Sequence, residues 1–396
     1  MKRRIVLTGD DWEFFRPITI TRPLADVRAG AFTFRERIQR LFYDSVITVK
    51  ARTMVAEAFT ARTGVPTNQL SAGKGPILLL KPNAIYNMEF HDKVIKAEPG
   101  TMFTSGGLKI GALVEEKEFP NSLEELELPE IEIEVVLIPT IWDLVNTNEK
   151  AIELDYSSCF GPEKEGRINK NAVLIESASI FVGAGAKVHA GVVLDASEGP
   201  IIIDEGAVVR PGAFVEGPCY IGKDTTVVSG WIRPGCSFGR ACRVGGEVEA
   251  SIFQGYSNKY HEGFIGHSYI GEWVNLGALT TTSDLKNNYS EVHVDQGEGP
   301  VATGQMKVGS FIGDHTKTGI GTLLNTGTCI GVNVNHYGTG FPPKHIRSFS
   351  WGTAEGYKEY TIEKAMETAR MVMSRREVEM LPEEENLLRF IHSLRK

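Results

Sequence analysis

Between about residues 173 and 334 an aliphatic residue recurs at every sixth position, and this period constrains the fold more than any other feature of the chain. The longest run without a slip is Ile203, Val209, Val215, Ile221 and Val227. A short fixed period means that one structural unit is stacked on copies of itself, and hexapeptides are typical of a parallel β-helix. An amphipathic helix repeats every 3.6 residues and a strand every two, so neither explains the pattern.

Composition and charge narrow the class of protein. The chain has 396 residues, which suggests two or three domains, and its formal charge is -8. This mild acidity argues against a nucleic-acid binder, which usually carries a basic face. The basic start Met1–Arg4 leads into an apolar run too short for a signal segment, and no apolar stretch approaches the roughly 18 residues of a membrane span. We expect a cytoplasmic protein that binds neither nucleic acid nor membrane.

The five cysteines predict neither a disulfide framework nor a metal site. Cys219, Cys236 and Cys242 occupy the small inward position of the hexapeptide, where cysteine acts as a compact apolar residue. Cys159 and Cys329 stand alone, and no C-x-x-C occurs. We therefore expect five reduced, structural thiols.

The residue pattern divides the chain into an α/β domain over 1–155, a β-helix over 165–345 and a helical tail over 355–396. In the first domain it predicts strands at 3–8, 46–49, 77–80 and 131–138, a helix at 32–42 and an exit helix beginning near 139–146. In the tail, a helix is predicted over 361–380. Its apolar face, with Met366 and Met373, is expected to pack against the β-helix or a neighbouring subunit.

The hexapeptide period is interrupted twice, and interruptions of a solenoid often carry its function. The first is the polar stretch Gly255–Gly263, expected as a loop outside the coil, and the second runs from Leu285 to about Gly304. The segment that begins at Tyr256 reads YSNKYHEGFIGHSYIGEWVNLGA. It resembles the active-site segment of bacterial glucosamine-1-phosphate acetyltransferases, the C-terminal domains of the bifunctional enzyme that makes UDP-N-acetylglucosamine.

This resemblance covers about residues 205–340 and rests on the order of a lysine, a histidine and a V-N-x-G-A motif. It implies that His261 is the catalytic base, once one residue is gapped, and that Arg233 holds the sugar phosphate. It also implies that Lys259 and Asn275 contact the substrate. A histidine, with a pKa of about 6.5, suits removal of the proton from a sugar ammonium before the amine attacks acetyl-CoA. Arginine can hold a phosphate through two hydrogen bonds.

The chain departs from that family at the acetyl-donor site, where D-L-K-N replaces N-Y-D-G. Asp284 and Lys286 are the residues that the resemblance places near acetyl-CoA. Two other interpretations of the histidine remain open. His261 is either a solvated loop residue or a zinc ligand of the kind found in hexapeptide carbonic anhydrases, although those need a close H-x4-H pair and His267 follows after five intervening residues.

A second resemblance concerns the first domain. Arg16–Pro23 is similar to the R-P-L-T-x-x-R-P element of sugar-phosphate nucleotidyltransferases, and Pro139–Asn146 to the P-W-D-L element at which their catalytic domain ends. The segment Thr21–Gly30 most resembles a shortened bacterial form of the bifunctional enzyme. Uridylyl transfer is thereby implied, with nucleotide or phosphate contacts from Arg16, Arg22, Asp26 and Arg28. Alternatively, the last two only pair with each other at a helix start.

Family members use Mg²⁺ for this step, and the chain departs from their pattern at three places. The glycine-rich loop is reduced to Thr8–Trp12, and Leu24 stands where a lysine is expected. Lys81-Pro82-Asn83 replaces the Gly-Asp whose carboxylate binds the metal. The sequence therefore leaves the metal ligands unknown.

Together these features predict a sugar-nucleotide enzyme that takes a sugar phosphate, a nucleoside triphosphate and acetyl-CoA. Its nucleotidyltransferase-like domain precedes a β-helix whose left hand is implied by the resemblance, and family members form homotrimers with active sites between subunits. Two alternatives remain open. One is a nucleotidyltransferase for another hexose-1-phosphate, such as a thymidylyl transferase, with the β-helix as a trimer scaffold. The other is a non-catalytic sensor of nucleotide sugars.

Overall fold

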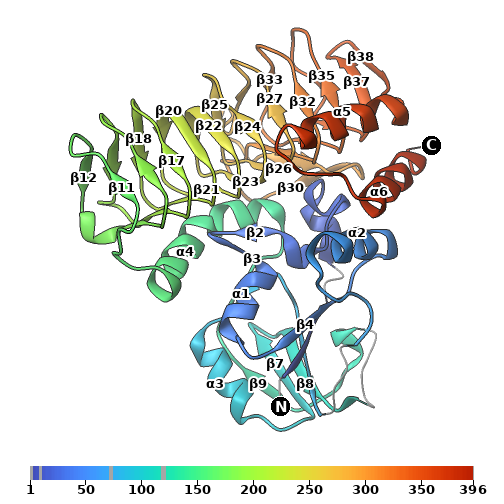
Figure 1. Cartoon of the computed structure of the whole chain (residues 1–396). Coiled ribbons are helices and arrows are strands. Elements are labelled where there is room, and N and C mark those ends of the chain that lie inside the picture. The colour runs from blue at the N-terminus through green and yellow to red at the C-terminus, as the bar shows by residue number, and fades with distance from the viewer. Residues whose placement is uncertain (1–2, 9–10, 71–74, 117–121, 396) are drawn as a thin grey trace.

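The computed structural model describes residues 3–8, 11–70, 75–116 and 122–395. An α/β domain lies beside a long β-helix, with helix α4 (Ile141–Cys159) between them (Figure 1). Helices α5 (Ile362–Ser374) and α6 (Pro382–Ser393) lie beside the end of the β-helix that is furthest along the chain. The predicted fold class is confirmed.

The first domain is built on a six-stranded sheet of order β4-β1-β5-β8-β7-β9. Its strands are β1 (Arg4–Leu7), β4 (Val46–Val49), β5 (Ile77–Leu80), β7 (Thr101–Ser105), β8 (Leu108–Val114) and β9 (Glu130–Glu132). The central strand β1 runs parallel to both β4 and β5. Every residue of β1 and β5 is buried, as expected for parallel strands covered on both faces.

Shorter elements complete this domain. They are the helices α1 (Phe34–Leu41), α2 (Thr53–Thr63) and α3 (Met88–Lys96), the 3-10 turns η1 (Asp11–Phe15), η2 (Ile18–Ile20), η3 (Leu24–Asp26) and η5 (Leu123–Glu125), and the two-residue strands β2 (Arg28–Ala29), β3 (Phe32–Thr33), β6 (Ala84–Ile85) and β10 (Val136–Leu137). The prediction of one strand over 131–138 is wrong. The chain pairs first with β7 through β9 and then with β6 through β10, so it changes partner midway.

The β-helix has three faces, which we call A, B and C. Face A comprises β11 (Arg167–Ile168), β14 (Lys187–Val188), β17 (Val208–Val209), the first halves of β20 (Thr226–Ile232) and β22 (Arg243–Glu249), β24 (Asn258–Lys259), β27 (Asn275–Leu276), β32 (Lys317–Thr318), β35 (Asn335–His336), β37 (Ser350–Thr353) and β38 (Gly356–Glu359). Face B comprises β12 (Val173–Ile175), β15 (Val193–Asp195), β18 (Ala213–Glu216), the second halves of β20 and β22, β25 (Phe264–Gly266), β28 (Thr281–Thr282) and β33 (Leu323–Leu324).

Face C comprises β13 (Ile180–Val182), β16 (Ile201–Ile203), β19 (Cys219–Ile221), β21 (Cys236–Phe238), β23 (Ile252–Gly255), β26 (Tyr269–Glu272), β31 (Ser310–Ile312), β34 (Thr328–Ile330) and β36 (His345–Ile346). The short turn η6 (Ser177–Ser179) precedes it. The aliphatic residues of the six-residue run, from Ile203 to Val227, are fully buried in one continuous core. Cys219, Cys236 and Cys242 fill the same interior, as their positions in the repeat predict.

Face C is covered by the first domain and by α4. The Asn148 side-chain amide donates to the Gly235 carbonyl and to Ser237 Oγ, at 2.9 Å each. Tyr269 and Phe311 of face C share a hydrophobic core with Phe15 of the first domain. This common core fixes the position of the α/β domain on the β-helix.

The first interruption of the repeat differs from its expected form. The stretch 255–263 is not a loop outside the coil: it contains β24, which pairs with β22 and β27 on face A. The second interruption contains a hairpin of β29 (His293–Asp295) and β30 (Pro300–Ala302), which docks on the first domain. There the Gln296 amide donates to the Arg16 carbonyl at 2.6 Å, and Val292 and Val294 join the core around Phe15.

The helical tail packs as its apolar pattern predicts. Met366, Ala369 and Met373 of α5 are buried, and Met366 shares a core with Phe349 of the β-helix. In the described part of the chain, none of the helices combines the length and the apolar character that crossing a membrane requires.

Candidate functional site

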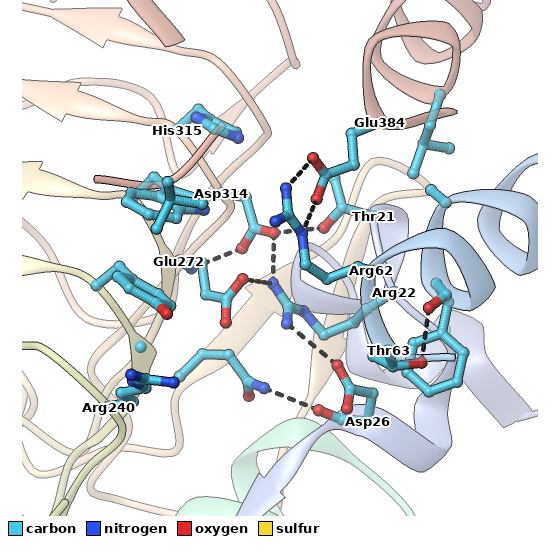
Figure 2. Close-up of a pocket in the computed structure, with 18 of the residues that line it drawn as sticks. Thr21, Arg22, Asp26, Arg62, Thr63, Arg240, Glu272, Asp314, His315 and Glu384 are labelled. Carbon is cyan, nitrogen blue, oxygen red and sulfur yellow. Dashed lines mark hydrogen bonds and ion pairs between the residues drawn. The ribbon is translucent and has the colours of Figure 1, made fainter. Parts of the chain in front are cut away.

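A cavity of about 330 Å³ lies where the α/β domain, the β-helix and the tail meet, and we call it the interdomain cavity (Figure 2). The α/β domain contributes side chains from the segment 21–28, which contains η3, from the start of α1 and from one side of α2. The β-helix contributes the corner between faces C and A, and the tail contributes the segment from α5 to α6. The side chains used below are Thr21, Arg22, Asp26, Arg28, Arg62, Gln254, Tyr256, Glu272, Trp273, Asp314, His315 and Glu384.

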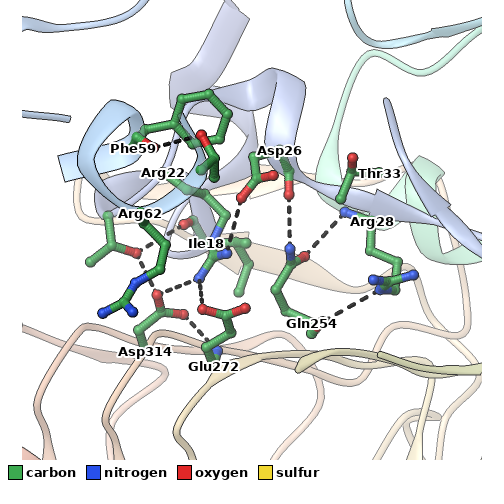
Figure 3. A network of polar contacts seen from close by, with 12 residues as sticks. Ile18, Arg22, Asp26, Arg28, Thr33, Phe59, Arg62, Gln254, Glu272 and Asp314 are labelled. Carbon is green, nitrogen blue, oxygen red and sulfur yellow. Dashed lines mark hydrogen bonds and ion pairs between the residues drawn. The ribbon is translucent and has the colours of Figure 1, made fainter. Parts of the chain in front are cut away.

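Arg22 is the centre of a buried ion network in this cavity (Figure 3). Its Nη2 lies 2.5 Å from an Asp314 carboxylate oxygen and 3.3 Å from one of Glu272, and its Nη1 lies 3.6 Å from Asp26. Thr21 Oγ1 donates to the same Asp314 oxygen at 2.6 Å. One guanidinium therefore joins two carboxylates of the β-helix to one of the α/β domain, across 292 residues of sequence in the case of Asp314.

Three carboxylates around one arginine leave an excess of negative charge. Burial raises the pKa of Asp26 to about 7, against the lowering effect of Arg22, and nearby Glu272 adds to the rise. Burial likewise raises the pKa of Glu272, while Asp314 repels its charge further. Arg22, whose own pKa is raised by the carboxylates despite burial, stays charged. We therefore expect part of this cluster to hold a proton at neutral pH.

Aromatic rings form a wall of the cavity along the corner between faces C and A. Tyr256, Trp273 and His315 occupy this corner on successive coils, each with a positive φ between 54° and 60°. The rings of Tyr256 and Trp273 stack with centroids 4.2 Å apart, and those of Trp273 and His315 at 6.4 Å. Burial, together with nearby Lys317, lowers the pKa of His315 to about 3, and its Nδ1 has no hydrogen-bond partner. A neutral imidazole thus presents an unused polar atom within the wall.

The structure shows which sequence-predicted nucleotide residues meet. Arg22, Asp26 and Arg28 all line the interdomain cavity. Asp26 pairs with Arg22 and, in the described part of the chain, has no ion pair with Arg28. Arg28 Nη1 donates to the Ala31 carbonyl at 2.6 Å. Arg16 lies elsewhere, paired with Glu13 and Glu298. Gly9 and Asp10 of the shortened loop lie outside the described residues.

The place of the expected metal carboxylate is occupied by a cation. Lys81 directly follows β5, with its Nζ 3.8 Å from Asp11 and 3.2 Å from Glu124. An ammonium repels a divalent cation and supplies no ligand oxygen. In the described ranges, no group of three acidic, histidine or cysteine side chains has the geometry to hold a metal. The residues present at this position do not fit Mg²⁺.

The predicted acetyl-transfer residues lie along the β-helix. His261 is exposed at the corner between faces A and B, and Asn275 is exposed on the next coil, where its Oδ1 accepts from Asn258 at 3.3 Å. Lys259 instead points into the coil, with 1% of its surface exposed, and its Nζ donates to the carbonyls of Gly245 (3.1 Å) and His261. Burial lowers the pKa of Lys259 to about 8.

The other predicted residues are more widely spread. Arg233 lies beyond the opposite end of face B, paired with Glu249 at 2.7 Å. Asp284 pairs with His267 at 2.8 Å; burial opposes ionisation, but this contact keeps the pKa of Asp284 below its usual value. Lys286 donates to the Glu291 carbonyl within the second interruption. Among the described residues, no hydrogen bond or ion pair joins His261 to any of these three, so their shared role stays a prediction.

Sequence reasoning missed the β-helix side of the interdomain cavity. Glu272 lies within the segment quoted for the acetyltransferase resemblance, which assigns it no role, and Asp314 and His315 carry no motif. All three are far from Arg22 in the sequence. One signal was available. Large side chains such as Trp273 and His315 stand at the corner position of the coil, where a positive φ favours glycine or asparagine, and such residues mark functional sites.

Comparison with known proteins supports both resemblances. Residues 5–161 match the family model described as sugar nucleotidyl transferase. The bifunctional sugar-1-phosphate nucleotidylyltransferase/acetyltransferase of Sulfurisphaera tokodaii is 34% identical over 143 residues, 35% of this chain and 36% of that protein. The bifunctional protein GlmU of Methanococcus aeolicus is 32% identical over 198 residues, 48% of this chain and 40% of that protein.

An uncharacterized acetyltransferase of Escherichia coli, YaiX, is 28% identical over 145 residues, 36% of this chain and 63% of that protein. The chain thus spans between 36% and 63% of the length of these relatives. Residues 5–161 match the sugar nucleotidyl transferase family model, and 35–48% of the chain aligns with bifunctional nucleotidylyltransferase/acetyltransferases, in agreement with the resemblance that the sequence shows.

Proposed function

We propose that the chain is a sugar-1-phosphate transferase that acetylates glucosamine-1-phosphate from acetyl-CoA on its β-helix, with His261 as the base. The observation that carries the proposal is an exposed imidazole at a corner of a β-helix that follows a sugar nucleotidyl transferase domain. Because acetyl-CoA and nucleoside triphosphates are made in the cytoplasm, we place the reaction there.

The chemistry needs one base and one leaving group. His261 takes a proton from the sugar ammonium, and the amine nitrogen then attacks the thioester carbonyl. A C–N bond forms, the C–S bond breaks, and the CoA thiolate leaves and takes up a proton. Asn275, one coil further along, is assigned a hydrogen bond to a sugar hydroxyl, and the exposure of its side chain supports this assignment. Lys259 is assigned no contact in this step, because its amine is used inside the coil.

A second copy of the chain is proposed to complete this site. The corner that carries His261 continues on the next coils as Leu279 and Ile320, which are 55% and 77% exposed. Leu279 N donates to the Glu262 carbonyl and Gly321 N to the Ala278 carbonyl, so these three turns lie one above another. Apolar side chains exposed in a row mark an association surface, and a cyclic homotrimer places such corners against neighbouring subunits.

Nucleotidyl transfer by the α/β domain is the second proposed activity, supported by the family match over 5–161. We propose N-acetylglucosamine-1-phosphate and UTP as its substrates. Since Lys81 replaces the metal-binding carboxylate, no step is assigned to Mg²⁺ at that position. If the chain binds a nucleotide sugar but catalyses no nucleotidyl transfer, the result would instead favour a sensor of nucleotide sugars.

The acetyl-transfer proposal is tested by incubating the purified chain with glucosamine-1-phosphate and acetyl-CoA and following free thiol. His261→Ala is expected to reduce the rate about 100-fold or more, as loss of a general base does. His189→Ala, which removes an exposed histidine from another coil, is the matched control and should keep the rate. Absence of thiol release, or equal rates for both variants, would overturn the assignment.

The nucleotidyl-transfer proposal is tested separately by pyrophosphate release. The substrates are N-acetylglucosamine-1-phosphate with UTP or dTTP, in Mg²⁺ and in EDTA. Release with UTP supports uridylyl transfer, and a preference for dTTP supports the alternative hexose-1-phosphate enzyme. No release with either nucleotide refutes nucleotidyl transfer without affecting the acetyl-transfer result.

A further inference from the structure

A second and larger cavity, of about 820 Å³, lies between the α/β domain, the last coils of the β-helix and α6, and we call it the cationic cavity. Its charged lining consists of Arg16, Arg52, His345, Arg347 and Arg395, and none of its lining residues is Asp or Glu. Its uncharged lining includes Trp12 and an apolar wall of α6 formed by Leu387, Phe390, Ile391 and Leu394. Four arginines therefore converge on one concave, largely apolar surface.

Most of these arginines lack a carboxylate partner. Arg16 pairs with Glu13 and Glu298, but within the described ranges Arg52, Arg347 and Arg395 form no ion pair. Arg52 lies over the Trp12 ring, 3.7 Å from its centroid, and donates to the Thr19 carbonyl. Burial first, and then the charge of Arg16, lowers the pKa of Arg52 to about 10. The fold thus holds like charges together, and the carboxylate of Glu13, which does not line the cavity, offsets only part of the cost.

The interdomain cavity shows the opposite arrangement. There Arg22 has three carboxylates, and Arg62 Nε donates to Glu384 at 2.7 Å. Arg22 and Arg62 of that cavity thus have carboxylate partners within the chain, whereas among the described arginines of the cationic cavity only Arg16 has such partners. An anionic ligand supplies it most directly, because arginine binds phosphate oxygens through paired hydrogen bonds.

We propose that the cationic cavity binds the diphosphate of a nucleotide ligand, with its ring system against the apolar wall of α6. Arg52 and Arg347 are assigned to the phosphates. The volume fits a cofactor-sized molecule, and an apolar wall with a few converging charged groups is typical of such sites. Two ligands share this chemistry: the nucleoside triphosphate of nucleotidyl transfer and coenzyme A, whose adenosine carries a diphosphate. The choice between these two ligands rests on the proposed function, whereas the anion site is inferred from the lining of the cavity alone.

This assignment changes where the phosphates are expected. The sequence points to Arg16, Arg22, Asp26 and Arg28, but Arg22 is occupied by carboxylates. The proposed site is instead composite, with cations from the α/β domain, from the coil that contains β36 and from the end of α6. Ligand binding would therefore hold the tail against the α/β domain.

The test titrates the full chain with UTP, coenzyme A and inorganic pyrophosphate, by calorimetry and by tryptophan fluorescence. Arg52→Gln and Arg347→Gln are each expected to weaken nucleotide binding about tenfold or more, the loss typical of one charged hydrogen bond. Arg210→Gln, which removes an exposed arginine elsewhere on the β-helix, is the matched control and should leave affinity unchanged. Thermal unfolding verifies that each variant is folded. If Arg52→Gln is unstable, the affinity of Arg347→Gln provides the test, because Arg347 is exposed.

Tighter binding of UTP identifies the nucleotide substrate, and tighter binding of coenzyme A identifies the acetyl donor. Either ligand should bind at least tenfold more tightly than pyrophosphate because its ring system also contacts the apolar wall of α6. Equal affinity for pyrophosphate would overturn the nucleotide assignment. No binding, or binding unchanged in both arginine variants, would overturn the site. Since His261→Ala leaves this cavity intact, failure of acetyl transfer and failure of ligand binding are distinguishable.

Discussion

Replacing Asp26 by asparagine tests the charge balance of the interdomain cavity. One guanidinium serves three carboxylates there, and burial raises the pKa of Asp26 to about 7. A neutral side chain of the same shape removes a charge that the fold disfavours. Asp26→Asn should therefore stabilise the protein at alkaline pH, although it also removes an ion pair with Arg22.

The magnitude follows from the pKa. The folded protein holds the proton of Asp26 more tightly than the unfolded chain does. The protonated side chain therefore stabilises the wild type fully below about pH 4, and this contribution is lost as the pH rises to about 7. A rise from 3.8 to about 7 corresponds to about 4 kcal/mol. Because the side chain keeps 20% of its exposure, water reduces this value. We expect Asp26→Asn to be more stable than the wild type by about 1–3 kcal/mol at pH 8.5.

The assay is urea or thermal unfolding of the wild type and the variant at pH 5 and pH 8.5. The difference should be largest at pH 8.5 and clearly smaller at pH 5, where only part of the stabilisation by the Asp26 proton is lost. Asp44→Asn, at an exposed aspartate outside the network, is the control and should match the wild type at both values. If Asp26→Asn is less stable at both pH values, or has the same pH dependence as the wild type, the reasoning is refuted.

Three further predictions concern the β-helix. Because burial lowers the pKa of Lys259 to about 8, the free energy of unfolding of the wild type should rise between pH 8 and about pH 10.5. Lys259→Met should not show this rise. If the free energy of unfolding depends on pH equally in both proteins, the buried position of the amine is contradicted. Gly230→Ala should lower the free energy of unfolding by more than 2 kcal/mol, because φ is +100° there and a Cβ would lie 2.2 Å from the Gly246 carbonyl oxygen. Gly191→Ala, at φ +74° in open space, should lower it by only about 1 kcal/mol in the same assay. Ile320→Glu should dissociate the proposed oligomer in analytical ultracentrifugation while Leu108→Glu on the α/β domain does not, and an unchanged mass for Ile320→Glu would exclude this corner as the interface.

The local residue pattern predicted elements well where all partners of an element lie in one sheet. The strands around Ile5 and Leu78 form as expected because their apolar runs pair with neighbours in a single sheet. The prediction of a single strand over 131–138 was wrong because the two halves of this stretch pair with different strands, and no local pattern encodes a change of partner. The prediction that 255–263 forms a loop outside the coil was also wrong. The polar pattern suggested exposure, but Lys259 enters the core because its amine donates to carbonyls of the coil.

The six-residue period determined the β-helix by itself, because each coil touches only its neighbours and the same aliphatic position recurs in every one. Motifs in the same sequence indicated the family of the first domain and the candidate base His261. Only the tertiary structure decided which charges meet. The Arg22–Asp314 pair spans 292 residues, and the cationic cavity joins Arg52 to Arg347. Such contacts depend on how the α/β domain sits on face C, which side-chain packing fixes and periodicity does not record.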